Sequence, residues 1–114
     1  MKKSKFHRKT GQRAAFMKNL AGNFILREKI ETTEARAKAL RPLVERLVTI
    51  ARRNRVQDLR LVSSRLADKK AALKLFYEVA PRYKDRAGGY TRIVQLAKTR
   101  KRDGSSTAII EFVR

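Results

Sequence analysis

Most side chains in this sequence that could do chemistry are cations, and they gather in segments suited to binding phosphate. Residues 1–13 contain no acid and carry Lys2, Lys3, Lys5, His7, Arg8, Lys9 and Arg13. A second segment surrounds a glycine pair and comprises Arg82, Tyr83, Arg86, Gly88, Gly89, Tyr90 and Arg92. A third segment, between two apolar runs, holds Lys98, Arg100, Lys101 and Arg102. Together with Lys18, these residues are the candidate contacts for a nucleic acid.

The charge balance of the whole chain supports the same chemistry. Thirty Lys and Arg residues against ten Asp and Glu give 114 residues a net charge of +20, while 42% of the positions are hydrophobic. Like charges at this density repel one another in a compact fold, so a polyanionic partner that neutralises them is expected. Nucleic acid phosphate is the strongest candidate.

The Gly88-Gly89 pair has two interpretations that the sequence alone leaves open. Glycine lacks a Cβ, so the backbone can turn tightly or approach another backbone closely. Tyr83 and Tyr90 could stack on unpaired bases while the neighbouring arginines contact phosphates. Alternatively, the glycines form a turn into a strand, and the two tyrosines belong to the core.

Catalytic sites find little support in the sequence. Cysteine is absent and His7 is the sole histidine, so neither a zinc site nor a histidine-centred triad can be assembled. Gly88-Gly89 matches no nucleotide-binding loop. Glu28, Glu31 and Glu34 are explained more simply as ion-pair partners or helix-start charges. No enzymatic activity, cofactor, metal or small-molecule substrate is expected.

The elements that must position these cations are those of one small α+β domain. Residues 1–9 are expected to form a flexible basic arm, and residues 10–114 a single RNA-binding domain. Helix-like spacing predicts a helix from Thr10 to Glu28, with Met17, Leu20, Ala21 and Phe24 on its apolar face. Residues 30–33 favour a short strand. Thr33 and Glu34 suit the start of a second helix that extends to about Arg53.

The expected helix that starts near Thr33 and Glu34 has the clearest apolar stripe, formed by Ala37, Leu40, Val44, Leu47, Val48 and Ala51. After it, helical periodicity continues as far as Pro81, and strand periodicity follows from about residue 90. A short helix is expected around Leu59–Leu66. Asp68 can cap another, which carries Ala72, Leu73, Phe76 and Val79 and is expected to end at Pro81.

Residues 90–97 and 107–113 predict a hairpin around Asp103-Gly104. A register with Val94 opposite Phe112 and Leu96 opposite Ile110 would place four apolar side chains on one face, which the helices could cover. Ala108 would then lie opposite Lys98, and Arg100, Lys101 and Arg102 would form an exposed basic tip. The expected architecture is several helices on one face of a short sheet with a C-terminal β-hairpin.

Two other classes of binding protein share some of these features. A nucleoid-type DNA-binding architectural protein would have the same charge and basic arm. A membrane-surface protein could use basic amphipathic helices, but the apolar stripes are those a folded core requires. The apolar runs are far shorter than the roughly 20 residues of a membrane span. An organellar transit segment is only faintly suggested by residues 1–13.

Several motifs carry a resemblance to a known family. His7-Arg8-Lys9-Thr10-Gly11, Asn19-Leu20-Ala21-Gly22, Ile30-Glu31-Thr32-Thr33 and above all Arg86-Ala87-Gly88-Gly89-Tyr90-Thr91-Arg92-Ile93 occur in order along the chain. The chain thereby resembles the seventeenth protein of the bacterial large ribosomal subunit. The resemblance implies an α/β fold bound to large-subunit ribosomal RNA near the exit of the nascent-chain tunnel. It also implies ribosomal-protein neighbours, a cytoplasmic ribosome of bacterial or organellar type, and no catalytic activity.

Overall fold

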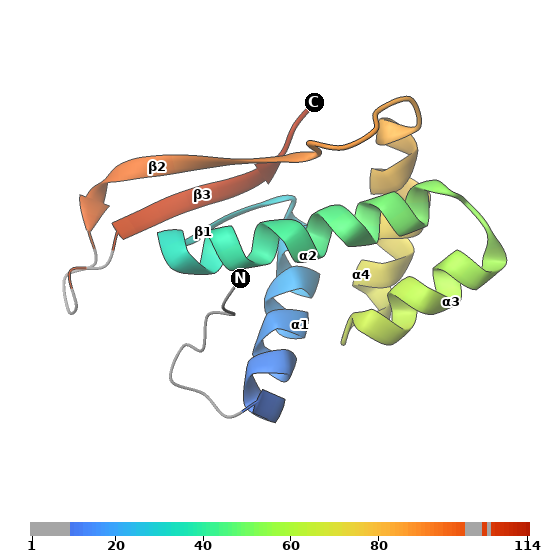
Figure 1. The fold of residues 1–114 in the computed structure, drawn as a ribbon, viewed down its shortest axis with the longest axis horizontal. Helices are drawn as coiled ribbons and strands as arrows, with labels where there is room; N and C mark the ends of the chain where they lie inside the picture. Colours follow the sequence, from blue (N-terminus) through green and yellow to red (C-terminus); the bar gives the residue numbers. More distant parts are fainter. Residues whose placement is uncertain (1–9, 100–103, 105) are drawn as a thin grey trace.

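The computed structural model describes residues 10–99, 104 and 106–114 (Figure 1). The helices are α1 (Thr10–Arg27), α2 (Glu34–Arg52), α3 (Val56–Arg65) and α4 (Lys69–Lys74), and α4 continues as a π-helical turn, η1 (Leu75–Val79), and a 3-10 turn, η2 (Ala80–Tyr83). The strands are β1 (Lys29–Thr33), β2 (Thr91–Thr99) and β3 (Ser106–Phe112). These elements confirm the α+β class.

The three strands form one antiparallel sheet in the order β1-β3-β2, so the last strand of the chain lies at its centre. Ile30 of β1 and Ile93 of β2 both pair with Ile110 of β3, which is fully buried. All helices lie on one side of this sheet, with α2 directly against it (Figure 1). The expected layering is therefore confirmed, and β1 proves to be the third strand of the sheet.

The register of the hairpin differs from the expected one. Ile93 pairs with Ile110 and Thr91 with Phe112, whereas Val94 pairs with Ile109 and is 43% exposed. The prediction is three residues out, and an odd shift moves every side chain of β2 to the other face.

An irregularity near the end of the hairpin accounts for two of these three residues, and the third is a one-residue offset at Thr99, which pairs with Ser106 where the predicted register would place Thr107. Gln95 pairs with Ala108 and Thr99 with Ser106, so β2 advances four residues while β3 advances two. The predicted pair of Ala108 with Lys98 is wrong for the same reason. Alternation of apolar residues cannot reveal extra residues of this kind, because each residue of β2 was assumed to face one residue of β3.

Helix α2 follows its predicted pattern. All six residues of the predicted stripe are buried, and the Thr33 hydroxyl accepts a hydrogen bond from the Arg36 backbone N–H at 3.3 Å. The helix continues through Pro42, which is exposed. Its apolar face therefore packs against the sheet and the other helices, while its cations face outward.

The rod formed by α4, η1 and η2 extends beyond its predicted end. Asp68 caps α4 as expected, since its carboxylate accepts from the Lys70 N–H at 2.8 Å. Pro81 does not end the rod, because it lies in the first turn of η2, where a missing N–H costs no helical hydrogen bond. Leu73 is not a core residue and is 37% exposed. The change from α-helical to π-helical winding begins shortly after it.

Candidate nucleic-acid interface

The Gly88-Gly89 segment is a turn held by a carboxylate that was not among the predicted site residues. Gly88 and Gly89 have φ of 153° and 64°, so both lie in the positive-φ range that favours glycine. Glu45 of α2 accepts hydrogen bonds from the Gly89 N–H at 3.1 Å, the Thr91 N–H at 2.9 Å and the Thr91 hydroxyl at 2.8 Å. Both carboxylate oxygens of Glu45 therefore fix the turn to α2. The sequence does not mark Glu45 as a functional residue, because a charged residue next to the apolar stripe of a helix is ordinarily a solvent-exposed one.

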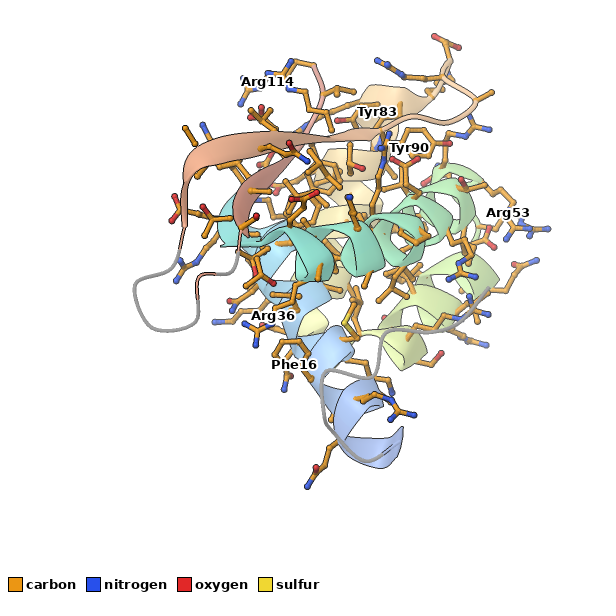
Figure 2. All side chains as sticks on the ribbon, turned by 60° about the vertical axis from the view of Figure 1, so that its left-hand side comes forward. Phe16, Arg36, Arg53, Tyr83, Tyr90 and Arg114 are labelled. Atoms are coloured by element: carbon orange, nitrogen blue, oxygen red, sulfur yellow. The ribbon has the colours of Figure 1, made fainter. Side chains whose placement is uncertain are left out.

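The two tyrosines that flank this turn belong to the core. Tyr83 and Tyr90 are 3% and 1% exposed, and their ring centroids lie 5.2 Å apart, as Figure 2 shows near the start of β2. The Tyr83 hydroxyl donates to the Val113 carbonyl oxygen, and the Tyr90 hydroxyl shares a hydrogen bond with Thr49 at 3.2 Å. Burial raises the pKa of Tyr83. Of the two interpretations of this segment, base stacking by these tyrosines is wrong, because neither ring is accessible.

Arg82 forms an ion pair at the point where three elements meet. Its guanidinium donates to both oxygens of Glu28, with 3.1 Å between Nη2 and Oε2, and the Lys74 ammonium lies 3.1 Å from Oε2. The hydrogen bond from Arg82, followed by that from Lys74, holds the pKa of Glu28 at about 2, against an ordinary 4.5. The stabilisation by this carboxylate is complete above its ordinary pKa and is lost as the pH falls towards 2.

Arg92 and Arg86 also have partners within the protein. Arg92 Nε lies 2.8 Å from Glu111 Oε1, across the β2–β3 pair, and its hydrogen bond lowers the pKa of Glu111. Arg86 donates from Nε to the Gly88 carbonyl oxygen at 3.3 Å. Both side chains remain exposed, so they can still present part of their charge to a ligand.

Four exposed arginines on α2 and α3 were not among the predicted contacts. Arg41, Arg46, Arg60 and Arg65 have no carboxylate partner among the described residues. Their signal was present, since each lies off the apolar stripe of its helix. Runs of charge are the more conspicuous signal, and these cations are spaced singly among apolar residues.

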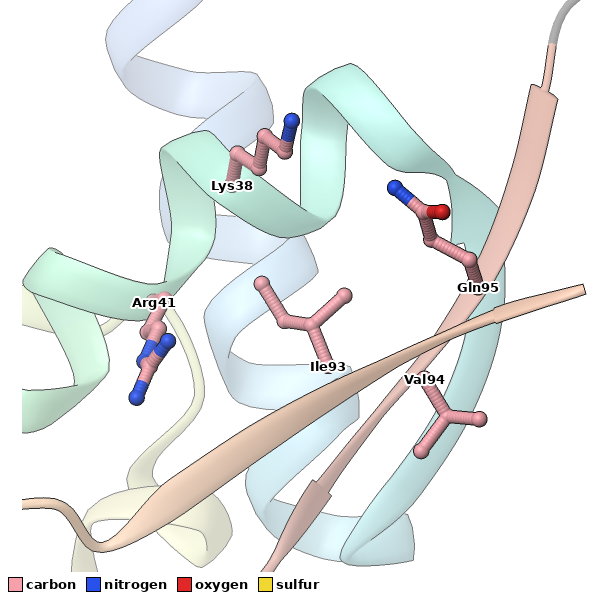
Figure 3. A pocket seen from close by; sticks show the side chains of 5 residues that line it. All are labelled: Lys38, Arg41, Ile93, Val94 and Gln95. Atoms are coloured by element: carbon pink, nitrogen blue, oxygen red, sulfur yellow. The ribbon is translucent and has the colours of Figure 1, made fainter.

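Two grooves bring some of these cations together. One, of about 670 Å³, lies between α2 and β2, where Lys38 and Arg41 project from the helix and Ile93 points towards it (Figure 3). The other, of about 350 Å³, is lined by Arg46 and Thr49 of α2 and by Arg65 of α3. Each groove is thus lined by two cations, and Glu45 also lines the second one.

Comparison with known proteins decides the family. The family model of ribosomal protein L17 matches residues 16–113. This chain is 51%, 53% and 46% identical to proteins named large ribosomal subunit protein bL17 from a Sulfurihydrogenibium species, Persephonella marina and Thermomicrobium roseum. These alignments cover 99%, 99% and 96% of this chain and 93%, 92% and 92% of the relatives.

The chain belongs to the ribosomal protein L17 family. It is therefore a structural constituent of the large subunit of a bacterial-type, cytoplasmic ribosome, and it is not an enzyme. The described residues contain no group of acidic and histidine side chains that could hold a metal ion. Within the same residues, no helix is long and apolar enough to cross a membrane.

The other predicted contacts of this L17 family member are placed only in part. Lys18 is exposed on α1, and Arg13 is half-buried on the same helix. The six candidates in residues 1–9 lie outside the described residues, as do Arg100, Lys101 and Arg102 of the predicted tip. Lys98 lies in β2.

The Gly89 turn yields a prediction that separates backbone strain from loss of a contact. Replacing Gly89 by Val should lower the free energy of unfolding by about 1–3 kcal/mol, because a β-branched residue is strained at φ of 64°. A Cβ at this position would meet no heavy atom within 4 Å beyond its chain neighbours, so crowding adds nothing. Urea unfolding measures this loss, and sucrose-gradient sedimentation measures incorporation into the large subunit, which should also fall.

Two variants provide the controls. Gly89→Asn should retain most of the stability, because asparagine tolerates the left-handed region. Arg92→Gln should reduce incorporation with little change in unfolding, since an exposed ion pair contributes at most about 1 kcal/mol. Equal stability of Gly89→Val and the unmodified protein would contradict the assignment of strain to this turn.

Proposed function

We propose that the protein binds large-subunit ribosomal RNA and stabilises its folded form near the exit of the nascent-chain tunnel. Membership of the L17 family supports the large-subunit location. The resemblance of the Arg86–Ile93 motif to the family supports the tunnel-exit location. The net charge of +20 supports RNA as the ligand.

The distribution of exposed cations is the observation that carries this proposal. Among the described residues, such cations lie on all four α-helices and beyond them, and they include Lys18, Arg41, Arg46, Arg60, Arg65, Lys69, Lys70 and Lys84. A protein that reads one groove of duplex DNA concentrates its contacts on the element that enters the groove. Cations on many elements instead fit a body where several RNA segments converge, each neutralised by its own part of the surface.

The mechanism is electrostatic stabilisation with a fixed geometry. Cations release counterions from the phosphates they neutralise, and the folded core holds those cations at constant separations. In this proposal Lys2, Lys3, Lys5, His7, Arg8 and Lys9, together with Lys98, Arg100, Lys101 and Arg102, make further contacts with phosphates. Arg13, Lys18, Arg82, Arg86 and Arg92 contribute from the folded domain, and neighbouring ribosomal proteins complete the site.

Competition between RNA and DNA tests the ligand. The protein is bound to a transcript of its own large-subunit ribosomal RNA, and binding is measured by filter retention in the presence of duplex DNA added at the same phosphate concentration. The transcript should remain bound, because only folded RNA matches the arrangement of the cations. Displacement by equal amounts of duplex DNA would instead support the nucleoid-type alternative.

Site-directed cleavage tests the position on the subunit. The chain has no cysteine, so Lys84→Cys or Arg60→Cys provides a single attachment point for an iron chelate. Hydroxyl radicals from the chelate should cut the ribosomal RNA segments that surround the tunnel exit in assembled subunits, and the cysteine-free protein provides the control. Cuts confined to RNA far from the exit would contradict the proposed location while leaving RNA binding intact.

A further inference from the structure

Tyr77 is the tyrosine that the fold leaves accessible. The chain has three tyrosines and no tryptophan, and Tyr83 and Tyr90 are buried. Tyr77 is 63% exposed, and it is the one aromatic residue among the exposed large apolar residues of the described chain. An exposed aromatic ring offers a flat apolar face on which a base can stack.

The ring of Tyr77 contacts one residue of the core. Phe76, only 6% exposed, meets Tyr77 in an edge-to-face contact with 4.9 Å between ring centroids and 82° between their planes. Both residues lie in the π-helical turn η1, a form of helix that is rare and often found at functional sites. A ring whose orientation is fixed in advance loses little conformational entropy when a flat ligand stacks on it.

The side of the rod that carries Tyr77 is apolar near the ring and cationic at its start. Leu73 is exposed one turn before Tyr77, and Lys69 and Lys70 are exposed about one turn earlier. Roughly 10 Å separates the lysine backbone from that of Tyr77, at 1.5 Å of rise per residue. Glu78, the one carboxylate in the rod, acts on Arg82 and raises its pKa, although Glu28 is the larger cause.

We infer that Tyr77 stacks on an unpaired base of the ribosomal RNA while Lys69 and Lys70 bind phosphates of the same strand. The inference rests on the proposed function, since it names a contact within the RNA interface. Aromatic rings beside cations are the usual means of binding single-stranded segments of RNA. The lysines favour RNA over a protein partner, because a protein seated on Tyr77 and Leu73 would have to supply acidic groups for two adjacent ammonium ions.

Affinity for a transcript of the large-subunit ribosomal RNA, measured over a range of salt concentrations, tests this contact. Tyr77→Phe keeps the ring and should bind like the unmodified protein. Tyr77→Leu keeps an apolar side chain but loses the stacking surface, so its affinity should fall roughly tenfold at each salt concentration. Because stacking releases no counterions, the slope of affinity against salt should not change in Tyr77→Leu.

Two further variants complete the comparison. Lys69→Gln with Lys70→Gln should weaken binding and also flatten the salt slope, by about one unit for each lost contact on duplex DNA and somewhat less on other nucleic acids. Val56→Ala changes an apolar residue that is 68% exposed at the start of α3, a different helix, and should bind normally. Thermal unfolding of every variant should match that of the unmodified protein, since all four positions are exposed.

The outcomes distinguish this inference from the proposed function. If the unmodified protein fails to bind the transcript, both are wrong. If the unmodified protein binds the transcript with an affinity that falls as salt is added, and Tyr77→Leu binds equally well, only the stacking contact is overturned. Tyr77→Leu could also bind the transcript normally but enter subunits less well. That result would assign Tyr77 to a protein neighbour and would overturn the stacking contact.

Discussion

Mutual repulsion among its cations is the constraint that the rest of this structure depends on. With thirty basic and ten acidic residues, the fold has few carboxylates available to hold it together. Glu28 joins the end of α1 to the rod through Arg82 and Lys74. Glu45 joins α2 to the glycine turn, and Glu111 pairs with Arg92 across two strands. These carboxylates therefore act at junctions between elements, where a single negative charge stabilises the packing of both.

Asp58, in the first turn of α3, is another carboxylate that stabilises a junction between elements. It is buried, and it pairs with Arg55 at 2.8 Å and with Arg53 at 3.6 Å where α2 turns into α3. The hydrogen bonds from Arg55 lower the pKa of Asp58, so it stays charged. Arginines at this turn are thus partly neutralised, whereas Arg46 and Arg65 nearby have no carboxylate partner among the described residues. The fold therefore neutralises part of its positive charge at junctions and leaves other cations on the surface without a carboxylate partner among the described residues.

The helices could be predicted because their signals are local. The stripe of α2, the Thr33 cap and the Asp68 cap depend on residues within one or two turns, and all three are confirmed. The register of the hairpin could not be predicted, since it depends on extra residues in β2 near Thr99. Membership of β1 in the sheet depends on a pairing with β3 about 80 residues later, which periodicity does not encode.

The sequence indicated what kind of ligand the candidate site suits, but less accurately which residues are accessible to that ligand. The charge runs and the Arg86–Ile93 motif indicated an RNA-binding ribosomal protein, and the family is confirmed. Tyr83 and Tyr90, which flank the glycine pair, proved to be core residues, because Val113 and Thr49 meet their hydroxyls only in the folded chain. Tyr77 was overlooked because it lies off the predicted apolar face of its helix and outside the runs of charge, so neither pattern singled it out.

The salt dependence of stability and of RNA affinity tests most directly whether repulsion among the cations limits the stability of the free protein. The thermal midpoint of the free protein and its affinity for the ribosomal RNA transcript are measured over the same series of sodium chloride concentrations. Added salt should raise the midpoint, because it screens repulsion among the surplus cations, and should lower the affinity, because it opposes counterion release. A midpoint that falls as salt is added would show that ion pairs outweigh repulsion, and would contradict this account.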